Sequence, residues 1–118
     1  MEHDEATRFA REWERDWNSH DLDRIMRHYA GEVEFSSPVA ARLVPDTGGV
    51  LRGKAALRAY WAEGLRRMPD LHFEVVGVYA GLDGVVVNYR NQLGQLVNEV
   101  LVFRDGLVVS GFGAYAAG

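Results

Sequence analysis

Residues 96–115, which read LVNEVLVFRDGLVVSGFGAY, carry the clearest structural signal in the chain. The stretches 96–104 and 107–116 are rich in β-branched and aromatic residues, and we interpret them with the period of two that is typical of β-strands. The Asp105-Gly106 pair between the two stretches is a strong hairpin signal. The sequence therefore predicts two antiparallel strands joined by a tight turn.

The same alternation continues on the N-terminal side of this hairpin. Two further stretches of period two cover 71–80 and 84–92, and short glycine-containing connections link them to each other and to the hairpin. Strands joined by such short connections pair antiparallel. Together these patterns predict a four-stranded antiparallel meander over the second half of the chain.

The first helix is predicted from aromatic residues near the N-terminus. Phe9, Trp13 and Trp17 follow one another at spacings of four, which places them on one side of a helix over 4–17. This apolar stripe has to pack against other elements, because a helix with one apolar side is stable only when that side is covered.

The remaining elements of the first half are shorter. A second helix is predicted over 21–29 and ends at Gly31, and a third begins at Gly53 and stops at Pro69. A strand at 32–35 lies between them. The segment 36–52 is rich in proline and glycine and predicts a long surface loop.

Composition restricts the partners that the protein can have. The 118 residues suggest one domain, 1–118, and the net charge of −4 argues against a nucleic-acid partner. The absence of cysteine excludes disulfides and thiolate metal sites, and the histidine spacings suit no metal site. Without a signal peptide or a membrane-spanning apolar run, the sequence predicts a soluble, cytoplasmic protein with no membrane partner.

The element order predicts an α+β fold in which three helices cover one face of the sheet. The opposite face is also partly apolar, and a large apolar sheet surface rarely stays in water. We therefore expect a homodimer that forms through the outer face of the sheet. The residues assigned to that face are Val86, Asn88, Arg90, Val100, Val102 and Phe112.

Three stretches of the chain resemble the nuclear transport factor 2-like superfamily, in its SnoaL-like and ketosteroid-isomerase-like branch. They are WNSHDLDRIMRHYAGEVEFSSP, LRGKAALRAYW and VFRDGLVVSG. The resemblance implies a cystatin-like roll, in which a strongly curved, mixed or antiparallel sheet wraps as a cone around the three helices of the N-terminal half. It also implies a pocket at the open end of the cone and, commonly, a dimer.

With the cone as a guide, alternation along each strand selects the side chains that point inward. The predicted ligand pocket holds mostly aromatic and apolar groups: Trp13, Trp17, Tyr29, Phe35, Ser37, Tyr60, Trp61, Tyr89, Asn91, Leu101, Phe103 and Tyr115. Gly111 and Gly113 leave room either for a ligand or for curvature of the sheet. Such a lining suits a small apolar molecule.

The catalytic positions of the family's steroid isomerases are altered in this chain. The resemblance places their proton-shuttling aspartate at Ser37 and their two oxyanion-stabilising residues at Trp13 and Leu101. Serine is a poor general base without a neighbouring base, and leucine donates no hydrogen bond. These departures argue against ketosteroid isomerase activity. Ser36 and Ser37 are interpreted first as strand-end hydroxyls that bond to the loop backbone.

Glu99 is the candidate catalytic residue, because it is the inward-facing carboxyl group. Next to aromatic and aliphatic side chains its pKa would rise toward a value useful for acid–base chemistry. The alternative is a hydrated or ion-paired carboxylate at the mouth of the cone. His28 is the second candidate for carrying a proton.

Two functions remain open at this point. The first is a cofactor-free acid–base enzyme, such as an isomerase, cyclase, dehydratase or hydrolase, that acts on an apolar substrate. The second is a non-catalytic module that binds a ligand or only dimerises. The missing aspartates favour the second, and a desolvated Glu99 would favour the first.

Overall fold

The structure is a computed structural model, and it describes residues 1–117 of the chain. Its helices are α1 (His3–Ser19), α2 (Leu22–Met26), α3 (Pro38–Leu43), the short 3-10 turn η1 (Pro45–Thr47) and α4 (Lys54–Arg67). Its strands are β1 (Tyr29–Ser36), β2 (Val50–Arg52), β3 (Glu74–Ala80), β4 (Gly84–Arg90), β5 (Leu96–Arg104) and β6 (Leu107–Tyr115).

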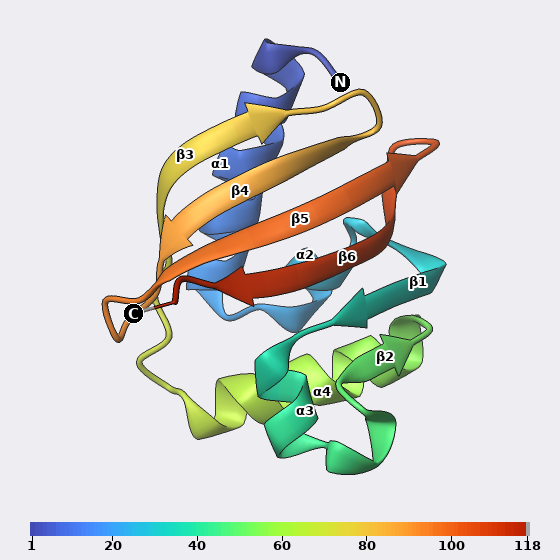
Figure 1. Ribbon diagram of the computed structural model, residues 1–118, viewed down its shortest axis with the longest axis vertical. Helices are drawn as coiled ribbons and strands as arrows, with labels where there is room; N and C mark the ends of the chain where they lie inside the picture. The colour runs from blue at the N-terminus through green and yellow to red at the C-terminus, as the bar shows by residue number, and fades with distance from the viewer. Residues whose placement is uncertain (118) are drawn as a thin grey trace.

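The six strands form one curved sheet in the order β2-β1-β6-β5-β4-β3 (Figure 1). The meander β3–β6 is antiparallel throughout, as the sequence predicts. Asp105 and Gly106 both have positive φ angles, 54° and 80°, which is the backbone that a tight hairpin turn requires. The sheet continues beyond the meander, because β1 pairs parallel to β6 and β2 pairs antiparallel to β1.

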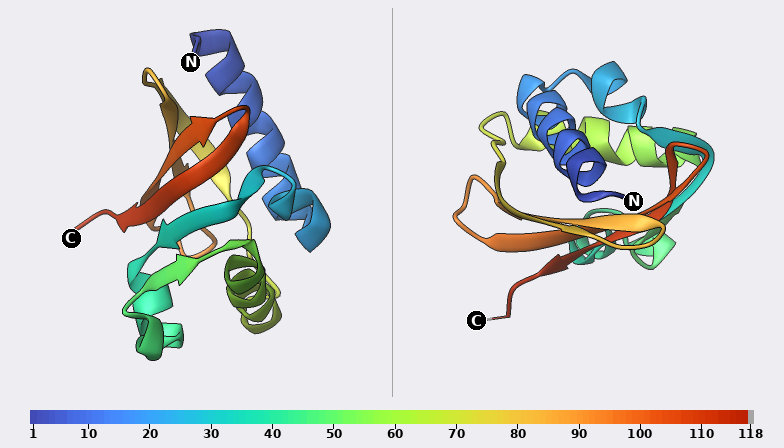
Figure 2. Two further views of the ribbon diagram at one scale, coloured as in Figure 1. Left: turned by 90° about the vertical axis from the view of Figure 1, so that its right-hand side faces the viewer. Right: turned by 90° about the horizontal axis from the view of Figure 1, so that it is seen from above.

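Helices α1, α2 and α4 lie on the concave side of the sheet (Figures 1 and 2). Among the described residues, no helix covers the opposite side of strands β3 to β6. The predicted stripe of α1 is buried, with Ala6, Ala10, Trp13 and Trp17 in the core. The α+β class and the curved sheet are therefore as predicted.

Alternation along the strands assigns the two faces of the sheet correctly. Val87 and Leu101 are fully buried on the concave side, whereas Val102 and Phe112 on the opposite side are 39% and 46% exposed. The fold thus has an apolar core between helices and sheet, and exposed apolar residues on the outer face.

Two predictions about the first half are wrong. The second helix ends at Met26, because Tyr29 already pairs with Val108 in the sheet, and Gly31 lies inside β1 rather than ending a helix. The segment 36–52 is not only a loop: it holds α3, η1 and the strand β2.

Local chemistry explains the extra helix α3. Ser37 accepts a hydrogen bond from the backbone N–H of Ala40 at 3.0 Å, and Pro38 occupies the first helical turn. A serine cap followed by proline is a typical helix start. The described residues thus form four α-helices rather than the three predicted. Within residues 1–117, no helix has both the length and the apolarity needed to cross a membrane.

Candidate functional site

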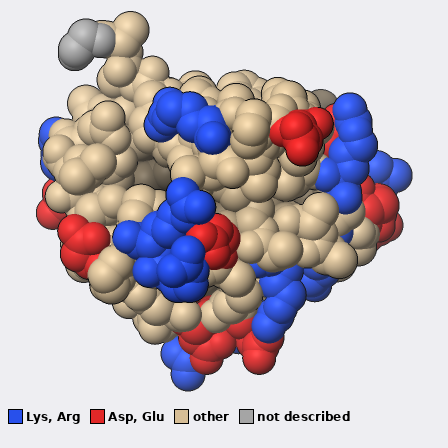
Figure 3. Space-filling view, turned by 90° about the horizontal axis from the view of Figure 1, so that it is seen from below, with Lys and Arg blue, Asp and Glu red and all other residues tan. Residues whose placement is uncertain are grey.

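A cavity of about 200 Å³ lies between the concave face of the sheet, α3, α4 and the turn that joins β4 to β5. Figure 3 views the molecule from below, the side on which α3 and α4 lie in Figure 1, and shows a hollow among uncharged atoms with Lys or Arg side chains beside it. Nine residues of the predicted pocket and site line this cavity: Trp17, Phe35, Ser37, Tyr60, Trp61, Tyr89, Asn91, Glu99 and Tyr115.

Glu99 lies on β5, and the alternation of that strand turns its side chain inward, where it is 5% exposed. Its neighbours across the sheet are Val87 on β4 and Gly113 on β6. A Cβ atom at Gly113 would lie 3.4 Å from Oε1 of Glu99, which is van der Waals contact. Gly113 therefore places its backbone directly beside the carboxyl group, with no side chain between them.

Few polar contacts offset the cost of burying the Glu99 carboxyl group. It accepts one hydrogen bond, from the Tyr89 hydroxyl at 3.3 Å, and it takes part in none of the ion pairs among residues 1–117. Burial raises the pKa of Glu99 to about 8, and the hydrogen bond from Tyr89 only partly opposes this rise. The group is therefore mostly protonated at neutral pH and still able to ionise.

Three further tyrosine hydroxyls lie within electrostatic range of this carboxyl group. Burial, and then the charge of Glu99, raise the pKa of Tyr115 to about 12 and that of Tyr29 well above its ordinary value. Burial also raises the pKa of Tyr60, partly opposed by its hydrogen bond with Ser37. Neutral phenols thus surround the carboxyl group, and each can donate one hydrogen bond.

The Ser37 hydroxyl bonds to the backbone of the following segment, as expected from the sequence, and it also reaches the lining of the cavity. The hydroxyl caps α3, and the same oxygen lies 3.3 Å from the Tyr60 hydroxyl. The residue therefore joins the short helix to the lining of the cavity.

Four residues of the predicted pocket do not line the cavity. Trp13 and Tyr29 are 1% exposed in the core, where Trp13 stacks on Phe73 with ring centroids 5.5 Å apart. Leu101 on β5 is buried in the core beside Gly111 of β6, and its Cδ2 would lie 2.8 Å from a Cβ atom at that glycine. Phe103 faces a different hollow, near the N-terminus.

Asn91 lines the cavity, but its side chain is used elsewhere. Its Oδ1 accepts hydrogen bonds from the backbone N–H groups of Leu93 and Gln95, both at 3.0 Å, and its Nδ2 donates to the Gln95 side chain. The carboxamide oxygen and one of its two N–H groups therefore shape the turn between β4 and β5.

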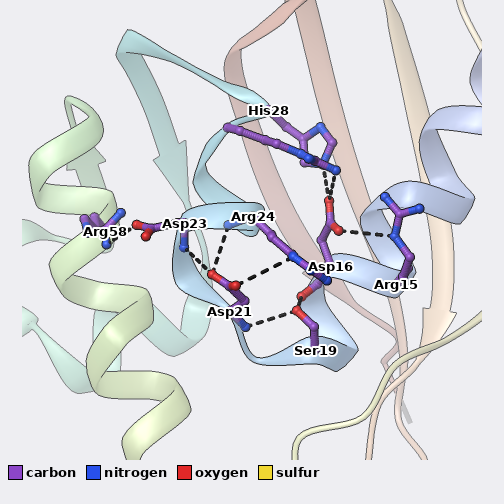
Figure 4. A network of polar contacts seen from close by, with 9 residues as sticks. Arg15, Asp16, Ser19, Asp21, Asp23, Arg24, His28 and Arg58 are labelled. Atoms are coloured by element: carbon purple, nitrogen blue, oxygen red, sulfur yellow. Dashed lines mark hydrogen bonds and ion pairs between the residues drawn. The ribbon is translucent and has the colours of Figure 1, made fainter.

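His28, the second candidate for a proton carrier, points away from the cavity. Its Nε2 lies 2.7 Å from Oδ2 of Asp16, an almost fully buried carboxylate on α1 that also pairs with Arg15 and Arg27 (Figure 4). Burial opposes the ionisation of Asp16, but the hydrogen bond from His28 and the charges around it outweigh burial and lower its pKa. This network fastens α1 to the start of β1.

Sequence reasoning gave Arg42 no role, although it lines the cavity from α3. The sequence does not reveal this position because the segment 36–52 is interpreted as a loop, and a loop has no period from which the direction of a side chain can be predicted. No group of three or more His, Asp or Glu side chains in the part of the chain that the structure describes is arranged to hold a metal ion.

Comparisons with known proteins identify the family and the fold of the chain. The family model of the SnoaL-like domain matches residues 10–111. A SnoaL-like protein of unknown function from Burkholderia thailandensis is 44% identical, with a TM-score of 0.93 and 98% of each chain covered. Among curated proteins, no match is found.

More distant solved structures share the fold. A candidate ketosteroid isomerase from Kribbella flavida is 18% identical, with a TM-score of 0.69 over 92% of this chain and 76% of that one. A candidate polyketide cyclase from Sinorhizobium meliloti is 12% identical, with a TM-score of 0.72 over 87% of this chain and 90% of that one. Other neighbours are described as cystatin-like or nuclear transport factor 2-like, in agreement with the resemblance stated above.

Proposed function

Because the chain belongs to the SnoaL-like domain family, we propose that it is a small-molecule enzyme that transfers protons without a cofactor, with Glu99 as the acid–base group. One observation carries the proposal: the Glu99 carboxyl group is buried beside a cavity, has one hydrogen bond and has a pKa raised to about 8. Structural carboxylates are usually ion-paired and have lowered pKa values, whereas acid–base catalysts have values near the working pH.

The protonation state of Glu99 sets the direction of the chemistry. Below pH 8 the carboxyl group holds its proton and can donate it to a carbonyl oxygen or a leaving group of the substrate. The carboxylate that remains accepts the hydrogen bond from Tyr89, and it takes a proton back from a C–H or O–H bond of the bound molecule. One group thus gives and receives a proton, which is sufficient for an isomerisation, a cyclisation or a dehydration.

The lining of the cavity indicates the kind of substrate. Trp17, Phe35, Trp61 and Phe73 present aromatic surface, and most of the other lining residues are aliphatic or phenolic. The volume of about 200 Å³ is below the usual range for sites that take drug-sized molecules. We expect a molecule of one or two rings with an oxygen atom that can meet Glu99.

A ligand-binding module without catalysis is the second candidate function. It is favoured by Ser37, Trp13 and Leu101, which occupy the positions where the resemblance to steroid isomerases implies catalytic groups. In this case Glu99 would only donate a hydrogen bond to the bound molecule.

Exchange of carbon-bound protons in deuterated water separates the two functions. β-Tetralone, a bicyclic ketone with acidic α-protons, is the probe, and its exchange is followed by proton NMR. We expect the wild-type protein to accelerate exchange above the buffer rate and the Glu99→Gln variant to lose that acceleration while still binding the ketone. Binding by both proteins without acceleration would overturn the enzyme and favour the binding module.

The outer face of the sheet supports a proposal about assembly. Tyr79, Val86, Val100 and Phe112 pair directly with one another across β3 to β6 and form an apolar row, of which Tyr79 is 63% exposed. In water such a row is unfavourable. We propose that a second copy of the chain covers it in a homodimer, whereas the net charge of −4 gives no support to a nucleic-acid partner. A cytoplasmic location stays a prediction from the sequence.

A further inference from the structure

The charges around the cavity are unevenly distributed. Among the residues that line it, only Glu99 and Arg42 have side chains that ordinarily carry a full charge at neutral pH. Glu99 is buried and mostly protonated below pH 8, so Arg42 is the full charge that a bound molecule meets.

Arg42 makes no ion pair or side-chain hydrogen bond with another residue of the described range 1–117, and it is exposed. Other surface arginines behave differently: Arg52 pairs with Glu34, and Arg58 pairs with Asp23. A guanidinium group that lines a cavity without a carboxylate partner is available for an anion.

The position of Arg42 is fixed by the fold of its segment. Ser37 caps α3, and the backbone N–H of Ser37 donates to the carbonyl of Gly49 at 3.1 Å, which folds the segment back on itself. Gly49 has a φ of +87°, and a Cβ atom there would lie 3.0 Å from that of Ala41, next to Arg42. The short helix is therefore packed closely against the strand that follows it.

The charges of Arg42 and Glu99 influence the same two tyrosines of the cavity, Tyr60 and Tyr115. The positive charge of Arg42 lowers the pKa of Tyr60 and of Tyr115, and the charge of Glu99 raises the pKa of both. Gln92 also lines the cavity, and its buried Oε1 has no hydrogen-bond partner among the described residues. A ligand between these groups would meet a cation, an amide oxygen that can accept a hydrogen bond and a carboxyl group around an otherwise apolar space.

We propose that the cavity binds a small aromatic or alicyclic carboxylate, with the carboxylate of the ligand paired to Arg42 and its ring against the aromatic lining. The inference rests on the proposed function, since it names the substrate class of the same cavity. A neutral hydrocarbon would leave the guanidinium group without a partner, whereas a carboxylate matches its planar fork and leaves the ring beside Glu99 for reaction.

A matched pair of probes tests this inference. β-Naphthoate is an anion, and β-naphthamide has the same shape without the charge, so the ratio of their dissociation constants isolates the contribution of the charge. Calorimetry is done with the wild-type protein and with Arg42→Gln, Arg42→Lys and Arg52→Gln. The last variant removes an equal charge from the surface outside the cavity.

We expect the wild-type protein to prefer the naphthoate by about tenfold. Arg42→Gln should abolish the preference, whereas Arg42→Lys should keep part of it and Arg52→Gln should keep all of it. Equal binding of both probes, or a preference that survives in Arg42→Gln, would overturn the carboxylate inference and leave the acid–base proposal standing. Failure of the wild-type protein to bind either probe would overturn the carboxylate inference, and absent β-tetralone exchange would overturn the acid–base proposal as well.

Discussion

The Tyr89 hydroxyl donates a hydrogen bond to Oε1 of Glu99 across 3.3 Å, between two neighbouring strands of the sheet. Both side chains are buried, and the bond is the one hydrogen bond of the Glu99 carboxyl group within residues 1–117. Donation to a carboxylate favours its charged form, so Tyr89 lowers the pKa that burial raises. The Tyr89 hydroxyl therefore keeps the pKa of Glu99 closer to neutral pH than burial alone would.

The first prediction concerns this hydrogen bond. Tyr89→Phe removes the donor, and we expect the pKa of Glu99 to rise above its value of about 8. A titration of the side-chain carboxyl carbon by NMR measures it. Tyr115→Phe is the matched control, because it removes a phenol from the same cavity that makes no side-chain hydrogen bond to Glu99. A pKa that stays constant or falls in Tyr89→Phe would contradict the assigned role.

The second prediction concerns stability and pH. An unfolded glutamate titrates at about 4.5, whereas folded Glu99 titrates at about 8, so folding requires uptake of a proton between these values. The wild-type protein should lose stability as pH rises through this window, by up to about 5 kcal/mol at its upper end. Glu99→Gln does not ionise, and we expect it to be the more stable protein at pH 8.

Chemical denaturation of both proteins between pH 4.5 and 8.5 measures this difference in the free energy of unfolding. At the acid end the folded state holds the proton and the unfolded state holds it half of the time, so the two curves should approach each other. A constant difference across the range would mean that Glu99 titrates normally in the folded protein.

The sequence predicts the inner and outer faces of the meander well, because a strand has a fixed period. Glu99 faces inward as its neighbours Val97 and Leu101 do, and Val102 and Phe112 face outward, as the alternation indicates. The hairpin at Asp105-Gly106 is equally local, since its positive φ angles depend on those two residues.

The sequence does not predict contacts between distant segments. The pairing of β1 with β6 joins Tyr29 to Val108, and no local pattern specifies it. The function of a polar side chain is equally hidden: Asn91 is inward by position, yet its hydrogen bonds shape a turn. Arg42 becomes meaningful only when α3 is placed against the cavity.

The third prediction concerns Asp16, whose buried carboxylate joins α1 to His28 at the start of β1. Asp16→Asn removes the negative charge but leaves His28 and Arg27 in place, and we expect a loss of about 3 kcal/mol in the free energy of unfolding at pH 7. Asp23→Asn, which changes an exposed ion pair with Arg58, should cost less than about 1 kcal/mol.

The pH dependence of this loss is opposite to that of Glu99. Because the pKa of Asp16 is lowered in the folded protein, its stabilisation is present above the ordinary carboxyl value of 3.8 and is lost as pH falls through the lowered value. The difference between the wild-type protein and Asp16→Asn should therefore shrink in strong acid. A difference that does not depend on pH would assign the loss to packing instead.

The last prediction concerns the outer face of the sheet. Phe112 is 46% exposed and pairs with Val100 in the apolar row, so Phe112→Glu would place a charge in the centre of the proposed dimer contact. We expect sedimentation velocity to show a dimer for the wild-type protein and a monomer for this variant. Leu82→Glu is the control, because Leu82 is exposed in the turn between β3 and β4. A Phe112→Glu variant that remains a dimer would place the subunit contact elsewhere, since a buried unpaired carboxylate costs more than a single interface of this kind tolerates.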